Sequence, residues 1–108
     1  MILDGLYFLE DATSTGDSIE VGNTKGSILV LQVKCDSAFE FSIQGSLDVN
    51  GDNYIDIAAI NMSDLSVVTS VSAEGVYQAD ISGLRKVKLS VSNIGSEALT
   101  VYGIIKEG

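Results

Sequence analysis

The sequence contains no histidine, and this absence removes many kinds of catalytic and metal site. Without histidine there is no Ser/His/Asp or Cys/His catalytic arrangement and no histidine-type zinc site. The segment "GNTKGS" has its lysine before the second glycine, unlike a phosphate-binding loop. Two carboxylates could hydrolyse a glycoside, but the deep cleft they need is rare in a chain of 108 residues. We therefore expect a protein that is not an enzyme and that binds no cofactor.

Proline and tryptophan are also absent, and cysteine occurs once. Without proline, sheet edges must be protected by charges, glycine bulges or another chain. Without tryptophan, the core must be built from Val, Ile and Leu, which favour strands. Cys35 cannot form an intrachain disulfide, and it alternates in phase with Leu29, Leu31 and Val33. It is therefore predicted to be a buried, inert core thiol.

Basic residues are few, with six Lys and Arg against fifteen Asp and Glu and a net charge of −9. Such a surface repels phosphate backbones and anionic membranes, so we expect no nucleic-acid or membrane partner. Three of the bases, Arg85, Lys86 and Lys88, are expected to lie on a solvated strand face. The opening "MILDGLYFLEDATST" has neither a basic start nor a sustained apolar run. We expect neither a signal peptide nor a membrane anchor, and a protein that is made in a cytoplasm and stays there unless it leaves inside a larger assembly.

Alternating apolar and polar residues indicate strands along most of the chain. "FEFSIQG" and "KVKLSVSN" each place every second residue on an apolar face, and glycines interrupt such segments at short intervals. This pattern predicts one all-β domain over residues 1–108, an antiparallel, jelly-roll-like β-sandwich of eight or nine short strands. The weakest assignment is 63–72, where Leu65, Val68 and Val71 also fit one helical face. The expected strands are 5–9, 18–21, 27–35, 38–46, 54–60, 66–72, 76–81, 85–93 and 98–105.

Two segments carry more apolar residues than a half-buried strand needs. In "SILVLQV", Ile28 and Val30 make the second face apolar as well, which indicates cover from a neighbouring segment or another subunit. The first segment, "MILDGLYFL", is similarly apolar. Together they predict an assembly surface, with burial inside the chain's own core as the alternative. Its candidate residues are Ile2, Leu3, Leu6, Phe8, Ile28 and Val30.

The stretch "GSLDVNGDNYIDI" places acidic and amide side chains at the spacing of a calcium-binding loop. However, Asn53 stands where the loop needs glycine, and Ala59 stands where a bidentate acid should close the site. Asn50-Gly51 is a strong hairpin signal, because both positions tolerate positive φ. We therefore expect a hairpin tip without metal, with a weak calcium site as the alternative. Its candidate contact residues are Asp48, Asn50, Asp52 and Tyr54.

The second half of the chain resembles a β-sandwich module of tailed-bacteriophage structural proteins. The resemblance rests on a "GSLDVNGDNY" hairpin, then "GVYQADISGL", "KVKLSVS" and "SEALTVYG", at residues 45–54, 75–84, 86–92 and 96–103. The segment "STGDSIEVGNTKGSILVLQV" adds the opening strands, so the likeness covers about residues 14–105. Val49 and Asn50 lengthen the hairpin relative to the family pattern, which makes its tip a candidate for particular contacts.

The resemblance implies a virion protein that decorates the capsid or forms part of a head fibre or tail. It implies capsid or tail partners and a homo-oligomer, with a trimer favoured, and no catalytic residues or cofactor. Assembly would take place in the cytoplasm of a bacterial host. A carbohydrate-binding module is the alternative, in which Tyr54, Tyr77 and Tyr102 would meet a glycan. A calcium-stabilised adhesion domain is a further alternative.

Overall fold

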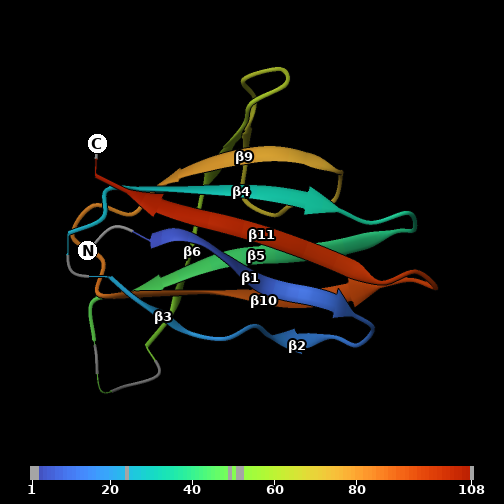
Figure 1. Cartoon of the computed structure of the whole chain (residues 1–108), viewed down its shortest axis with the longest axis horizontal. Helices are drawn as coiled ribbons and strands as arrows, with labels where there is room; N and C mark the ends of the chain where they lie inside the picture. Colours follow the sequence, from blue (N-terminus) through green and yellow to red (C-terminus); the bar gives the residue numbers. More distant parts are fainter. Residues whose placement is uncertain (1–2, 24, 49, 51–52, 108) are drawn as a thin grey trace.

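A computed structural model describes residues 3–23, 25–48, 50 and 53–107. These residues form eleven β-strands in two antiparallel sheets (Figure 1). They contain no helix that is long and apolar enough to cross a membrane. The all-β sandwich prediction is confirmed, while its jelly-roll detail stays a prediction. The strands are β1 (Leu3–Ala12), β2 (Gly16–Asp17), β3 (Val21–Gly22), β4 (Ile28–Lys34), β5 (Phe39–Ser46), β6 (Ile55–Ile57), β7 (Ala59–Asn61), β8 (Val67–Val68), β9 (Gly75–Asp80), β10 (Lys86–Ile94) and β11 (Leu99–Lys106).

The strands divide into two sheets that we call sheet A and sheet B. Sheet A has the order β1-β11-β4-β9-β7-β8, and sheet B has the order β2-β10-β5-β6, with β3 also paired to β10. In Figure 1, β1 and β11 lie in front of β5 and β10, so the view is onto the outer face of sheet A. Each sheet therefore has one face toward the other sheet and one face outward.

The core lies between the two inner faces and follows the alternation in the sequence. In β4, Leu29, Leu31 and Val33 are buried, and in β10 the inward-facing buried residues are Val87, Leu89 and Val91. Lys86, at the first position of β10, is also buried but is not part of this core. The rings of Phe39 and Phe41 on β5 stack in this core with centroids 6.1 Å apart. Cys35 is also buried there, as the sequence predicts. Burial of this contiguous aliphatic and aromatic set is the main stabilising contribution to the sandwich.

Two predicted strands are each divided between the sheets. The segment 54–60 forms β6 in sheet B and then β7 in sheet A. In the segment 66–72, β8 belongs to sheet A, whereas Val71 exchanges two backbone hydrogen bonds of 2.7 and 3.0 Å with Phe41 of sheet B. Segments that pass between sheets in this way form the corners of a sandwich. The prediction of one continuous strand in each segment is therefore wrong, although the extended conformation is right.

The predicted strand 18–21 is also wrong in its bounds. Instead, β2 ends just before that segment, β3 begins at its last residue, Val21, and both short strands pair with β10. The Ser18 backbone N–H donates to the Leu89 carbonyl over 2.8 Å, so the chain between β2 and β3 still follows β10. Two strands, β2 and β3, thus replace one expected strand, as β6 and β7 replace 54–60, and these two divisions account for the difference between the nine expected ranges and the eleven observed strands.

Strand β1, at one edge of sheet A, pairs irregularly with β11. Its pairing with β11 shifts register three times, between Leu3 and Leu6, between Tyr7 and Leu9, and between Leu9 and Ala12. Asp11 has a φ of 51°, in the left-handed region that few non-glycine residues occupy. Bulges of this kind bend a strand and redirect its side chains. They therefore make the edge strand β1 less regular as a template for pairing with another chain.

Candidate functional site

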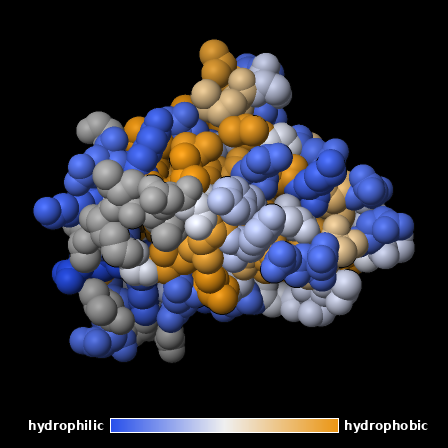
Figure 2. Space-filling model, viewed as in Figure 1, coloured by the Kyte–Doolittle hydropathy of each residue, from blue (hydrophilic) through white to orange (hydrophobic). Residues whose placement is uncertain are grey.

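The outer face of sheet A carries a row of apolar side chains. Residues directly opposite each other on paired strands project to the same face. Ile104 on β11 pairs with Val30 on β4, and both Val30 and Ile60 on β7 pair with Gln78 on β9. Ile28 lies beside Val30 on β4. We call Ile28, Val30, Ile60 and Ile104 the apolar row, and Figure 2 shows hydrophobic side chains gathered over β4 and β9 on this face.

More exposed apolar residues extend this surface toward β7 and β8. Ile60 is 41% exposed, and Met62 and Val76 are each 42% exposed. The Met62 backbone N–H donates to the Val76 carbonyl over 2.9 Å, which keeps these two neighbours together. Ile28 and Val30 are half-buried on the outer face and are not part of the inner core. Their burial by another subunit stays a prediction.

The N-terminal candidates for an assembly surface are divided by the structure. Phe8 is 3% exposed and belongs to the chain's own core, so it is removed from the candidate surface. Leu6 is partly buried and packs against that core. Leu3 pairs with Ile105 through the backbone of β1, and Ile2 lies outside the described residues. The alternation within β1 explains the burial of Phe8, because its neighbour Tyr7 points outward.

The candidate loop lies between β5 and β6, which pair as an antiparallel hairpin. Residues 47–54 join the two strands, so the connection is longer than a two-residue turn. The Asp48 carboxylate accepts hydrogen bonds from the Asn50 backbone N–H at 3.0 Å and from the Asn53 amide at 3.3 Å. This Asx-type turn uses Asp48 to hold the loop's own backbone. Asn50 is exposed, and Asp52 lies outside the described residues.

Tyr54, the last loop candidate, is held against sheet B by a group of charged residues. Its hydroxyl donates to Glu20 Oε2 over 2.5 Å. The Lys86 and Lys88 ammonium groups lie over its ring, 5.1 and 4.2 Å from the centroid. This contact is a cation–π interaction, and it fixes the base of the hairpin to β10.

The same group of residues contains two ion pairs. Lys88 contacts Asp17 at 2.6 Å, and Lys86 contacts Glu20 at 3.6 Å. The hydrogen bond from Lys88 lowers the pKa of Asp17, and the hydrogen bond from Tyr54 lowers the pKa of Glu20. We call Asp17, Glu20, Tyr54, Lys86 and Lys88 the charge cluster of sheet B.

The charge cluster corrects the prediction of a solvated basic face. Lys86 is 8% exposed as a residue, and the side chain of Lys88 is 14% exposed. Only Arg85, of the three neighbouring bases, is exposed. The alternation in the sequence correctly predicts that Lys86 and Lys88 face outward from the core. However, Tyr54, Asp17 and Glu20 cover them. These bases therefore stabilise the chain itself and offer little positive surface to a partner.

The tyrosines proposed for glycan contact have different surroundings. Tyr77 is 2% exposed, its hydroxyl donates to the Ala73 carbonyl over 2.8 Å, and burial raises its pKa. Tyr77 is therefore a core residue and is removed from the glycan candidates. Tyr54 has its ring beneath two lysines. Tyr102 is 38% exposed and makes an edge-to-face contact with Tyr7, with ring centroids 4.9 Å apart.

Tyr7 is a candidate that the sequence reasoning missed. It pairs with Tyr102, which pairs with Gln32, and Gln32 in turn pairs with Val76. These four residues form a second row on the outer face of sheet A, which we call the aromatic row. The sequence signal for Tyr7 is the alternation in "GLYFLE": Tyr7 directly precedes the buried Phe8, so its side chain projects to the opposite face of the strand. The partners of Tyr7 lie on distant segments, so its surroundings cannot be read from that signal.

Solved structures of phage-derived proteins share this fold. The SPBc2 prophage-derived protein YomS matches with a TM-score of 0.83 and 25% sequence identity, over 94% of this chain and 89% of that chain. The PBSX exported protein XepA matches with a TM-score of 0.86 and 19% identity, over 94% of this chain. The matched region spans only 36% of XepA, so that likeness concerns a part of the larger protein and shows the fold alone. No protein-family model matches the sequence, and no curated protein does so either.

These comparisons confirm the coarser part of the resemblance noted from the sequence. The fold is one found in phage-derived proteins, and YomS matches over nearly the whole of both chains. The finer assignment to a capsid, head-fibre or tail component stays a prediction.

Proposed function

We propose that this chain is a non-enzymatic phage virion protein that acts through protein–protein assembly. The observation that carries the proposal is the likeness to prophage-derived YomS over 94% of this chain and 89% of that chain. The chain would attach to capsid or tail proteins as an accessory or structural component, assembled in the cytoplasm of a bacterial host. The lack of histidine supports a role without acid–base catalysis.

The proposed assembly surface is the apolar row of sheet A. Several aliphatic side chains face outward there, and burying them against another copy would contribute about 25 cal/mol for each Å² of apolar surface removed from water. Asp80 and Lys106 pair with Ile28 from either side, so opposite charges border the row. An apolar centre with a charged border is the usual composition of a subunit interface. A homo-oligomer formed through this face follows from the proposal.

The experiment that tests the proposal combines two mass-spectrometric measurements. Native mass spectrometry of the purified chain should give a defined oligomer. Proteomic analysis of purified phage particles, from a host that carries the gene, should find the chain in fixed ratio to capsid or tail proteins. A stable monomer would contradict assembly through the apolar row. Absence from the particles would contradict the virion role.

A further inference from the structure

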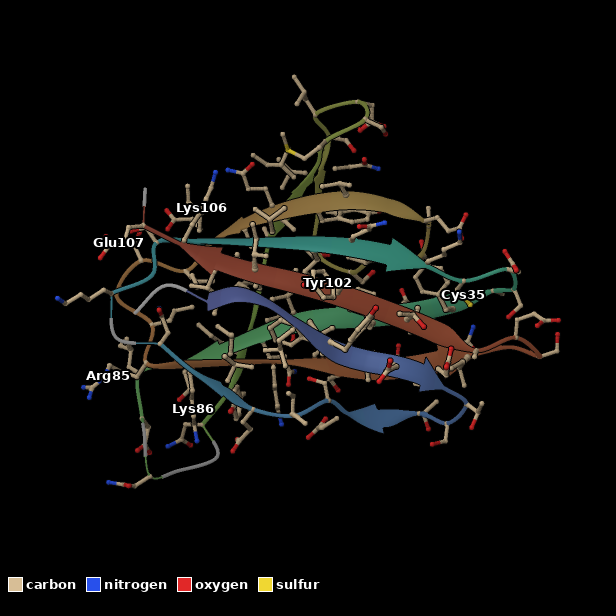
Figure 3. All side chains as sticks on the ribbon, viewed as in Figure 1. Cys35, Arg85, Lys86, Tyr102, Lys106 and Glu107 are labelled. Atoms are coloured by element: carbon tan, nitrogen blue, oxygen red, sulfur yellow. The ribbon has the colours of Figure 1, made fainter. Side chains whose placement is uncertain are left out.

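A cleft of about 560 Å³ opens on the outer face of sheet A, beside the aromatic row. It lies where β1, β4 and β11 come together, and Figure 3 labels two residues that line it, Tyr102 on β11 and Cys35 just beyond β4. The cleft is separate from the apolar row and from the charge cluster of sheet B. The lining residues that matter for binding are Tyr7, Tyr102, Asp11, Gln32, Lys34 and Asp36.

The two tyrosines give the cleft an aromatic wall. Tyr7 is 47% exposed, and its ring meets that of Tyr102 at 72°. The Tyr102 ring also lies across the backbone of Gly5, where a Cβ atom would be 2.0 Å from the Tyr102 hydroxyl oxygen. Gly5 has a φ of 153°, a conformation that L side chains rarely adopt. The close approach of this glycine positions Tyr102 over β1 and leaves both rings accessible.

Polar groups surround the aromatic wall. The Asp11 backbone N–H donates to Thr100 Oγ1 at 3.1 Å, and the Thr100 hydroxyl lies 3.4 Å from Asp11 Oδ1. These contacts hold Asp11 in its left-handed conformation at the rim of the cleft. Strand bulges are over-represented at sheet edges and beside functional sites, and β1 is an edge strand of sheet A.

Gln32 and Lys34 supply amide and ammonium groups on β4. Within residues 3–23, 25–48, 50 and 53–107, neither side chain forms a hydrogen bond or an ion pair. Gln32 can both donate and accept, Lys34 can donate, and the Asp11 and Asp36 carboxylates can accept. The cleft therefore offers both kinds of hydrogen-bonding group next to an aromatic surface.

We propose that this cleft binds a neutral saccharide. Sugar hydroxyls donate to carboxylates and accept from amides and ammonium groups, and the apolar face of a sugar ring packs on tyrosine. An anionic ligand would meet two carboxylates in a protein of net charge −9, and a cationic ligand would leave the Lys34 ammonium without an acceptor. A neutral polyhydroxylated ligand satisfies all of these groups. The inference goes beyond the assembly role and does not depend on it.

The test is a titration of the isotope-labelled protein, followed by NMR, with neutral oligosaccharides of glucose, galactose and N-acetylglucosamine. Saturable shifts are expected at the amides of Asp11, Gln32 and Thr100. Tyr102→Ala should weaken binding about tenfold, because it removes an aromatic contact. Gln32→Ala should weaken binding without changing the melting temperature. Gln78→Ala is the matched control, because Gln78 lies on the same outer face but does not line this cleft.

Two outcomes would overturn the proposal. One is the absence of saturable shifts with every neutral oligosaccharide, and the other is equal binding by the Gln32→Ala and Gln78→Ala variants. Choline and a sulfated oligosaccharide serve as charged probes, and preference for either would overturn the neutral class of ligand. Oligomer formation and particle association are measured separately, so failure of this inference leaves those results unchanged.

Discussion

The outer faces of the two sheets differ, although their inner faces are alike. Both inner faces are aliphatic and aromatic and meet in one core. The outer face of sheet B carries serines, glutamine and the charge cluster, whose members pair with each other. The outer face of sheet A carries the apolar row, the aromatic row and a cleft. Folding requires the inner faces to be apolar, but it does not require an apolar outer face on sheet A.

The two outer faces differ in how many of their polar groups already have partners within the chain. On sheet B, Lys88 pairs with Asp17, and Gln44 Nε2 donates to Asp56 Oδ1 over 2.8 Å. These polar groups already have partners within the chain. On sheet A, exposed isoleucine, valine and tyrosine side chains adjoin polar groups that can bind a ligand. We therefore propose a stabilising role for the outer face of sheet B and an interacting role for that of sheet A.

The largest expected effect on stability comes from truncating the buried lysine of sheet B. Lys86→Ala removes the buried aliphatic part of the lysine side chain. It also removes the contact of the ammonium group with the Tyr54 ring and its ion pair with Glu20. We expect the free energy of unfolding to fall by about 1–2 kcal/mol. Denaturant titration measures this loss.

The matched control is Lys25→Ala, which truncates an exposed lysine between β3 and β4. We expect its effect to stay within about 0.5 kcal/mol, as for most surface substitutions. Equal losses in the two variants would contradict the stabilising role assigned to the charge cluster.

A smaller effect is expected from acidification. Hydrogen bonds from Lys88 and Tyr54 lower the pKa values of Asp17 and Glu20, so their stabilising contribution is present above the pKa of the unfolded chain. That contribution is lost as the pH falls below the ordinary range of an unfolded carboxylate and through the lowered folded pKa values. Because both carboxylates are largely exposed, the loss should be modest. Thermal melts at a series of pH values measure it.

The double variant Asp17→Asn, Glu20→Gln provides the control for acidification. It lacks both titrating groups of the charge cluster, so its stability should depend less on pH in this range than that of the parent chain. An identical pH dependence in the two proteins would show that other carboxylates dominate the acid response.

The sequence predicted most of the strands because their inner faces alternate so regularly. "FEFSIQG" and "KVKLSVSN" form β5 and β10 with the expected residues inward, and Cys35 is buried as expected. Alternation does not reveal to which sheet a strand belongs. Residues 54–60 keep an extended pattern while they pass from sheet B to sheet A, so the division into β6 and β7 could not be read from the sequence.

The polar interactions were the hardest part to predict, because their partners are far apart in the chain. Asn23 is buried, and its amide donates to the carbonyls of Gly26 and Leu84 at 3.0 and 2.9 Å. The segment "GNTKGS" gave no sign of this role beyond its mismatch to a phosphate loop. Lys86 contacts Tyr54 and Glu20, which lie in loops far from it in the sequence. The cleft likewise combines residues of β1, β4 and β11, which only the folded chain brings together.

The native masses of two matched variants, Ile60→Lys and Ile55→Lys, show whether the outer face of sheet A forms the oligomer. Both isoleucines are exposed, at 41% and 65%, and they lie on neighbouring segments of opposite sheets. The account predicts that Ile60→Lys converts the oligomer to a folded monomer, because a charge enters the apolar row, while Ile55→Lys keeps the parent mass. Equal masses for the two variants, whether oligomeric or monomeric, would contradict the claim that the outer face of sheet A is the interacting face.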